Sequence, residues 1–160
     1  MGNKVDLFND IYTRLNTAIG AGKPLASVNR VQVGSREEAR KMNDLPIINM
    51  NLSSGTEIAI SQPNCKRDEM TIDIILIVSK PDATTENNLF NKVAGTGALY
   101  LFEDLLNVVD KTVTDVIDLT FSATAGQIPE YSYDVEYLEG MIEFSFELIV
   151  QTADFTVGSR

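Results

Sequence analysis

The 160-residue chain predicts an α+β fold, in which two main helices pack on a mixed, largely antiparallel sheet. Two observations lead to this prediction. Apolar residues recur at helical spacing in two separate segments, and in several other segments they alternate with polar residues as strands require. Apolar residues make up 44% of the chain and charged residues 22%, which is typical of a globular protein. At this length we expect a single domain covering residues 1–160.

The first predicted helix covers residues 4–19, and Gly20 follows it as a stop signal. Its apolar stripe consists of Val5, Phe8, Ile11, Tyr12, Leu15 and Ile19. The second predicted helix covers about residues 88–109. Its stripe consists of Ala98, Leu101, Phe102, Leu105 and Val109. Glycine disfavours a helix interior by about 1 kcal/mol, so Gly95 and Gly97 mark either the true start of this helix or a kink.

Strands are predicted at about residues 28–33, 45–52, 57–60, 70–79, 116–122, 131–137 and 141–151. Residues 34–44 are polar and predict a loop or a solvated helical turn, and residues 61–68 predict a loop. The second half of strand 70–79 is apolar on both faces, which predicts a central strand covered on both sides. We expect the last two strands to form a hairpin with one buried face and one wet, acidic face.

Charge is distributed unevenly along the chain. The formal net charge of −10 divides into about −2 for residues 1–111 and about −8 for the remainder, and residues 112–159 contain no lysine or arginine. Binding to DNA needs cations that displace the counterions of the phosphates, so an acidic surface does not grip DNA but can line a passage for it. The acids in and around the predicted hairpin are Glu130, Asp134, Glu136, Glu139, Glu143 and Glu147. They form either a solvated outer face or a surface that faces a lumen or a partner.

The sequence offers little for catalysis or for metal binding. Histidine is absent, which removes the commonest general base and the commonest metal ligand. The acids at 68, 69 and 73 lack further ligands at suitable spacing, and we interpret them as a solvated sheet edge. Cys65 is the only cysteine and predicts a loop thiol without a partner base. We therefore expect no enzymatic activity, no cofactor and no bound metal, and the lack of a long apolar run predicts no membrane span.

The order of elements is a helix, several strands, a second helix and further strands that end in a long one. This order resembles that of the tail terminator, or tail completion, proteins of long-tailed bacteriophages. The resembling segments are residues 11–15 (IYTRL), 45–50 (LPIINM), 70–78 (MTIDIILIV), 98–106 (ALYLFEDLL) and 140–147 (GMIEFSFE).

The resemblance implies a structural virion protein with no catalytic residues, assembled in the host cytoplasm and located in the tail. It implies a ring of six subunits that caps the tail tube, stops its growth and joins it to the head connector. The partners would be other copies of the chain, the tube protein and the head-completion protein, and DNA would pass without being specifically bound. We expect Tyr131, Tyr133 and Tyr137 and the loop 80–92 to supply subunit contacts.

Three other classes of function remain open from the residues themselves. One is a different phage neck or tail structural protein, such as a head–tail adaptor or a tube-like protein. Another is a monomeric cytosolic binding or inhibitor domain whose acidic face meets a basic partner. The third is a carboxylate-dependent hydrolase, which the absence of histidine and of a ligand cluster disfavours.

Overall fold

The computed structural model describes residues 4–79, 89, 97–115, 120–121, 132–151 and 155–156. The predicted α+β class is confirmed, since helices pack on one mixed, seven-stranded sheet. The elements are α1 (Lys4–Thr17), β1 (Arg30–Val33), α2 (Arg36–Arg40), β2 (Ile47–Ala59), β3 (Cys65–Ser79), α4 (Ala98–Asp115), β4 (Thr120–Phe121), β5 (Tyr133–Leu138), β6 (Met141–Gln151) and β7 (Phe155–Thr156).

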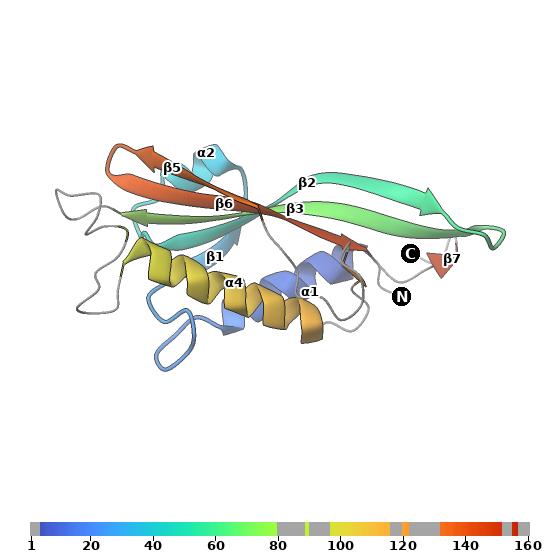
Figure 1. Ribbon diagram of the computed structural model, residues 1–160, viewed down its shortest axis with the longest axis horizontal. Coiled ribbons are helices and arrows are strands. Elements are labelled where there is room, and N and C mark those ends of the chain that lie inside the picture. The colour runs from blue at the N-terminus through green and yellow to red at the C-terminus, as the bar shows by residue number, and fades with distance from the viewer. Residues whose placement is uncertain are drawn as a thin grey trace.

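The sheet is ordered β1-β2-β3-β6-β4, with β5 paired to β6 and β7 paired to β3. Only β1 and β2 are parallel, and every other pairing is antiparallel. Figure 1 shows α1 and α4 on one face of the sheet and the short α2 on the other face. The two strands predicted to be central, 70–79 and 141–151, lie next to each other in the middle of the sheet.

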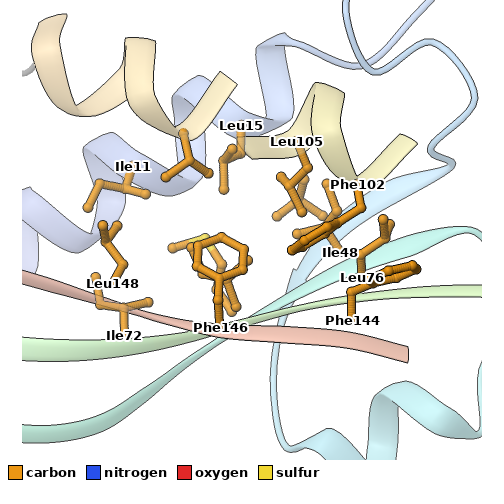
Figure 2. Packing of buried hydrophobic residues seen from close by; sticks show 14 of the residues in the cluster. Ile11, Leu15, Ile48, Ile72, Leu76, Phe102, Leu105, Phe144, Phe146 and Leu148 are labelled. Atoms are coloured by element: carbon orange, nitrogen blue, oxygen red, sulfur yellow. The ribbon is translucent and has the colours of Figure 1, made fainter. Parts of the chain in front are cut away.

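The main core lies between the sheet and the helices α1 and α4 (Figure 2). Every second residue from Met70 to Leu76 in β3 and from Ile142 to Val150 in β6 belongs to it, as the period of a strand requires. Phe102 of α4 stacks on Phe144 of β6, with ring centroids 4.6 Å apart, and makes an edge contact with Phe146. Aromatic contacts of this kind add to the stabilisation from burial.

A second, smaller cluster lies on the other face of the sheet and consists of Ala39, Ile47, Ile75 and Ile77. Ala39 belongs to α2, so this helix covers the alternate residues of β3. The prediction that the second half of β3 is covered on both sides is therefore confirmed. The segment 34–44 contains a helical turn, but it is a covering element of the core rather than merely a solvated one.

The predicted break between strands 45–52 and 57–60 is wrong. β2 runs without interruption for 13 residues, and its register with β3 shifts between Leu52 and Ser54. A β-bulge accommodates the extra residue, so small polar residues that predicted a loop continue the strand. The loop predicted at 61–68 is also too long, because β3 begins at Cys65. Both errors arise where β2 is mostly exposed and the pairing of β2 with β3 continues without a hydrophobic alternation.

The remaining element boundaries shift by a few residues. α4 begins at Ala98, directly after Gly97 with its positive φ of 124°, so the glycine precedes the helix rather than kinking it. Residues 88 and 90–96 of the predicted helix lie outside the described residues. The helix continues to Asp115, where the strand 116–122 was expected to follow, and only residues 120–121 of that strand are described, as β4. The short β7 was not predicted.

Candidate functional site

The face of the sheet that carries α2 also carries most of the acids of the last hairpin. Residues that are directly opposite in neighbouring strands point to the same face. Asp134 is opposite Ser145, Glu136 is opposite Glu143, and Asp73 is opposite Glu147. We call the surface formed by Asp73, Asp134, Glu136, Glu143, Ser145 and Glu147 the acidic face.

Two of these cross-strand pairs bring like charges together. Glu136 of β5 is directly opposite Glu143 of β6, and Asp73 of β3 is directly opposite Glu147 of β6. Such a pair destabilises a sheet by an amount of the order of 0.2–1 kcal/mol. The arrangement therefore needs a cation close to each pair.

Two arginines of α2 supply these cations. The Nε of Arg40 lies 2.7 Å from the Oε2 of Glu143, and its Nη2 lies 2.9 Å from the Oε2 of Glu136. The Nη2 of Arg36 lies 3.2 Å from the Oδ2 of Asp73, and its Nε lies 3.4 Å from the Oε1 of Glu143. Arg40 thus bridges one like-charged pair, and Arg36 connects the second pair to Glu143.

Glu143 is the centre of this arrangement, since both arginines contact it and only 1% of its side chain is exposed. A buried carboxylate needs such partners, because burying an unpaired charge is very unfavourable. The hydrogen bond to Glu143 raises the pKa of Arg40 above its ordinary value; the charges of Glu143 and Glu136 add to this increase, and burial opposes it. Arg40 therefore keeps its positive charge in ordinary buffers.

Polar contacts at the start of α2 hold these arginines in place. The side chain of Asn49 donates to the carbonyl of Gly34 at 2.8 Å, and Gln32 donates to the Oδ1 of Asn49 at 3.1 Å. Ser35 is the N-cap of α2 and accepts a hydrogen bond from the backbone N–H of Glu38 at 3.2 Å. Because α2 has only five residues, these contacts and Ala39 fix the direction of Arg36 and Arg40.

The predicted acids differ in how exposed they are. Asp134, Glu136, Glu139 and Glu147 are exposed, whereas Glu130 lies outside the described residues. The expectation that Glu143 faces water is wrong, because α2 lies over it and two arginines enclose it. The acidic face is consequently not one unbroken negative surface.

Of the predicted contact residues, Tyr133 and Tyr137 are half-exposed and lie on β5, at the edge of the described sheet. They point to the face that carries α4, since Tyr133 pairs with Phe146 and its ring lies 4.9 Å from that of Phe102. They are therefore on the opposite side of the hairpin from its acids. Tyr131 and almost all of the loop 80–92 lie outside the described residues.

A surface that the sequence did not predict is the projecting part of the β2–β3 ribbon, which we call the arm (residues 51–69). Figure 1 shows that it extends past the ends of α1 and α4. Most residues of its first strand are exposed, and so are residues 61–64 at its tip. In the sequence of this region, stretches with alternating apolar residues are interrupted by polar residues. This mixture predicted two short strands and a loop.

The acids at 68, 69 and 73 do not form a metal site. Among the described residues there is no group of three or more histidine, cysteine, aspartate or glutamate side chains that could hold a metal ion. The interpretation as a solvated sheet edge is also wrong, because Asp68 is buried and Asp73 on the central strand β3 pairs with Arg36. Cys65 is partly buried at the first residue of β3, and its Sγ lies 3.7 Å from the Oε1 of Gln62.

Comparison with known proteins adds no family. No protein-family model matches the chain, and a search of curated proteins gives no match. Within the ranges that the structure describes, no helix has the length and apolar character needed to cross a membrane. A functional assignment therefore depends on the geometry described above and on the resemblance in the order of elements.

Proposed function

We propose that the chain is a structural subunit of a ring, resembling a phage tail terminator, whose acidic face borders a conduit for DNA. The observation that carries this proposal is the difference between the two faces of the sheet. One face is covered by α1 and α4 over a large apolar core. The other face carries acids that are exposed in the described part of the chain, among them Asp134 and Glu147.

The acidic face suits the passage of DNA for an electrostatic reason. Exposed carboxylates repel phosphates, so DNA beside them has no attractive interaction that would slow its passage. The two arginines of α2 are already bound by carboxylates, and a phosphate would have to displace these partners to bind. The surface therefore contains cations, but they are not available to bind phosphates.

The arm supports the assembly part of the proposal. A subunit with unlike contact surfaces at its two ends forms heterologous contacts, and these close into a ring when the rotation between copies permits. We take the number of six subunits, the tube and connector proteins as partners, and the location in the virion tail from the resemblance. No cofactor or catalytic residue is needed for this role.

The decisive experiment measures the size of the assembly. We would record native mass spectra of the purified protein, alone and with the tube protein, and examine the mixture by negative-stain electron microscopy. We expect closed rings of six copies, either alone or on contact with the tube. Only monomers, at high concentration and with tube protein present, would contradict the ring and favour an acidic binding domain.

A second experiment tests the conduit. Asp134→Lys with Glu147→Lys changes two exposed acids of the acidic face into cations. Particles carrying this variant should assemble normally but eject DNA slowly, and the defect should shrink at high salt because screening shortens the range of the attraction. The matched control is Glu103→Lys with Asp104→Lys, which makes the same charge change on the exposed side of α4. Equal ejection rates for both variants would show that the acidic face does not border the DNA.

A further inference from the structure

The helix α2 is held on the sheet differently from α1 and α4. Those two helices bury large apolar side chains in the main core, among them Leu15 and Phe102. α2 lies alone on the other face of the sheet, and its only buried side chain is that of Ala39. Because the free energy gained from burial grows with the apolar area buried, α2 gains much less from it than α1 and α4 do.

The backbone of α2 is hydrogen-bonded within its own segment. The N–H groups of Ala39 and Lys41 donate to the carbonyl oxygens of Ser35 and Glu38. A helix of five residues is too short to be stable without tertiary contacts. The segment, which we call the strap (residues 35–41), therefore depends on its side chains to remain on the sheet.

Both ends of the strap are attached to the sheet. On one side the N–H of Gly34 donates to the carbonyl of Met50 at 3.2 Å. On the other side Arg30 of β1 forms an ion pair with Asp44 at 3.1 Å and contacts the sulfur of Met42. The strap can therefore lift away from the sheet between two fixed points without the unfolding of β1 or β2.

Ion pairs provide most of the attachment between these points. Arg36 contacts Asp73 and Glu143, and Arg40 contacts Glu136 and Glu143. The side chains of Arg36 and Arg40 are 39% and 30% exposed, so water and dissolved ions reach both arginines. Salt weakens the attraction between charges that are partly exposed.

The surface beneath the strap is apolar. Ile47, Ile75 and Ile77 are buried there and form the second cluster together with Ala39. Lifting the strap exposes these isoleucines and Glu143, and it separates Arg36 and Arg40 from their carboxylates. The open state thus presents a surface that the closed state lacks.

We propose that the strap opens as a unit, in a salt-dependent way, while the sheet and the main core stay folded. Segments held by few apolar contacts open locally at a lower free energy than the whole domain unfolds. In the closed state carboxylates occupy both arginines, and in the open state the arginines and the isoleucines face water. This inference does not depend on the proposed ring.

Thiol labelling measures the opening. Leu76 and Ile77 are adjacent in β3 and fully buried, but Ile77 lies under the strap and Leu76 lies in the main core. Ile77→Cys and Leu76→Cys, each in a Cys65→Ala background, place one thiol on each side of the sheet. Labelling under native conditions should be at least about tenfold faster for Ile77→Cys, because local opening reaches only that side. From about 0.1 M to about 1 M NaCl it should rise about threefold for Ile77→Cys and remain unchanged for Leu76→Cys.

Two variants of the strap, made in the Ile77→Cys protein, test the role of the ion pairs. Arg40→Ala removes the contacts to Glu136 and Glu143 and should accelerate labelling about a hundredfold. The matched control is Lys41→Ala. Lys41 is the neighbouring cation, is exposed and makes none of the ion pairs described for the strap, so its removal should change the rate by less than about twofold.

Trypsin tests the same opening in the original protein. The strap contains the cleavage sites Arg36, Arg40 and Lys41, and a protease cuts a folded segment mainly when it opens. Cleavage in the strap, located by mass spectrometry, should increase with salt relative to cleavage after the exposed Lys23. The comparison with Lys23 corrects for the effect of salt on trypsin itself.

Three results would overturn the inference. Equal labelling of Ile77→Cys and Leu76→Cys would show that the strap opens only when the whole domain unfolds. Labelling of Ile77→Cys that responds neither to salt nor to Arg40→Ala would show that ion pairs do not hold the strap. If either cysteine variant fails to fold, trypsin decides, and strap cleavage that stays constant with salt relative to Lys23 contradicts the proposal.

Discussion

Removing Arg40 tests whether the ion-pair cluster under α2 stabilises the fold. Arg40 makes the two shortest ion pairs of the acidic face, to Glu143 at 2.7 Å and to Glu136 at 2.9 Å. Arg40→Ala leaves Glu136 and Glu143 directly opposite each other without the cation between them. Arg36 remains beside Glu143, at 3.4 Å, and compensates part of its charge.

The expected cost follows from burial. Removing one partner of a buried ion pair costs roughly 3–5 kcal/mol when it leaves an uncompensated charge. The side chain of Arg40 is 30% exposed and Arg36 still contacts Glu143, so we expect the lower end of this range, about 3 kcal/mol. Part of the cost is the repulsion between Glu136 and Glu143, which contributes tenths of a kcal/mol.

The assay is equilibrium unfolding in urea, with the free energy of unfolding obtained from the midpoint and the slope. The matched control is Arg30→Ala, which removes an arginine from an exposed ion pair with Asp44 at 3.1 Å. Exposed pairs contribute roughly 0–1 kcal/mol, so the control should change the free energy of unfolding by less than about 1 kcal/mol.

A second variant separates the loss of the ion pair from the cost of leaving the Glu143 carboxylate without Arg40. In the Arg40→Ala background, Glu143→Leu removes the buried carboxylate that has lost a partner, and it should recover at least about 1 kcal/mol. If Arg40→Ala costs no more than Arg30→Ala, or if the added Glu143→Leu destabilises the protein further, then the cluster does not stabilise this face as we argue.

Three further predictions concern the core, the hairpin turn and the chemistry of the chain. Phe146 is almost fully buried against Phe102, so Phe146→Ala should cost roughly 3–5 kcal/mol in urea unfolding, and a loss under about 1 kcal/mol would contradict its placement. Gly140→Ala should cost roughly 1–2 kcal/mol from its positive φ alone, because a methyl group there meets no atom within 4 Å; an unchanged midpoint would refute this explanation. Elemental analysis of the purified protein should find no stoichiometric transition metal, and a stoichiometric metal would overturn the expectation of a purely structural role.

The sequence predicted those parts of the fold in which burial follows a strict period. In β6, residues 142, 144, 146, 148 and 150 are apolar and buried, and the alternation identified the strand with its inward face. In β3 the apolar residues on both faces, such as Leu76 and Ile77, showed that the strand is covered on both sides. In such segments the hydrophobic effect buries each apolar residue at the position that the alternation predicts.

The parts that the sequence did not predict depend on contacts between distant segments. The alternation in β6 gives Glu143 an outward position, and nothing near it in the sequence indicates that Arg36 and Arg40, about a hundred residues earlier, cover it. Most residues of the arm's first strand are exposed, so this strand is held by pairing across the ribbon rather than by a hydrophobic pattern. Backbone pairing of this kind cannot readily be predicted from a single sequence.

The ion pairs of α2 connect the stability of the fold with the proposed conduit. A phosphate that approached Arg40 would exchange one charge-assisted hydrogen bond for another and would leave the buried Glu143 without its closest partner. The exchange therefore gains little attraction and loses the compensation of a buried charge. Because Glu143 is buried, it cannot turn into water and release Arg40, whereas the exposed partner Glu136 can. If the acidic face borders DNA as proposed, a buried acid beneath the arginines keeps them from phosphates more effectively than further exposed acids would.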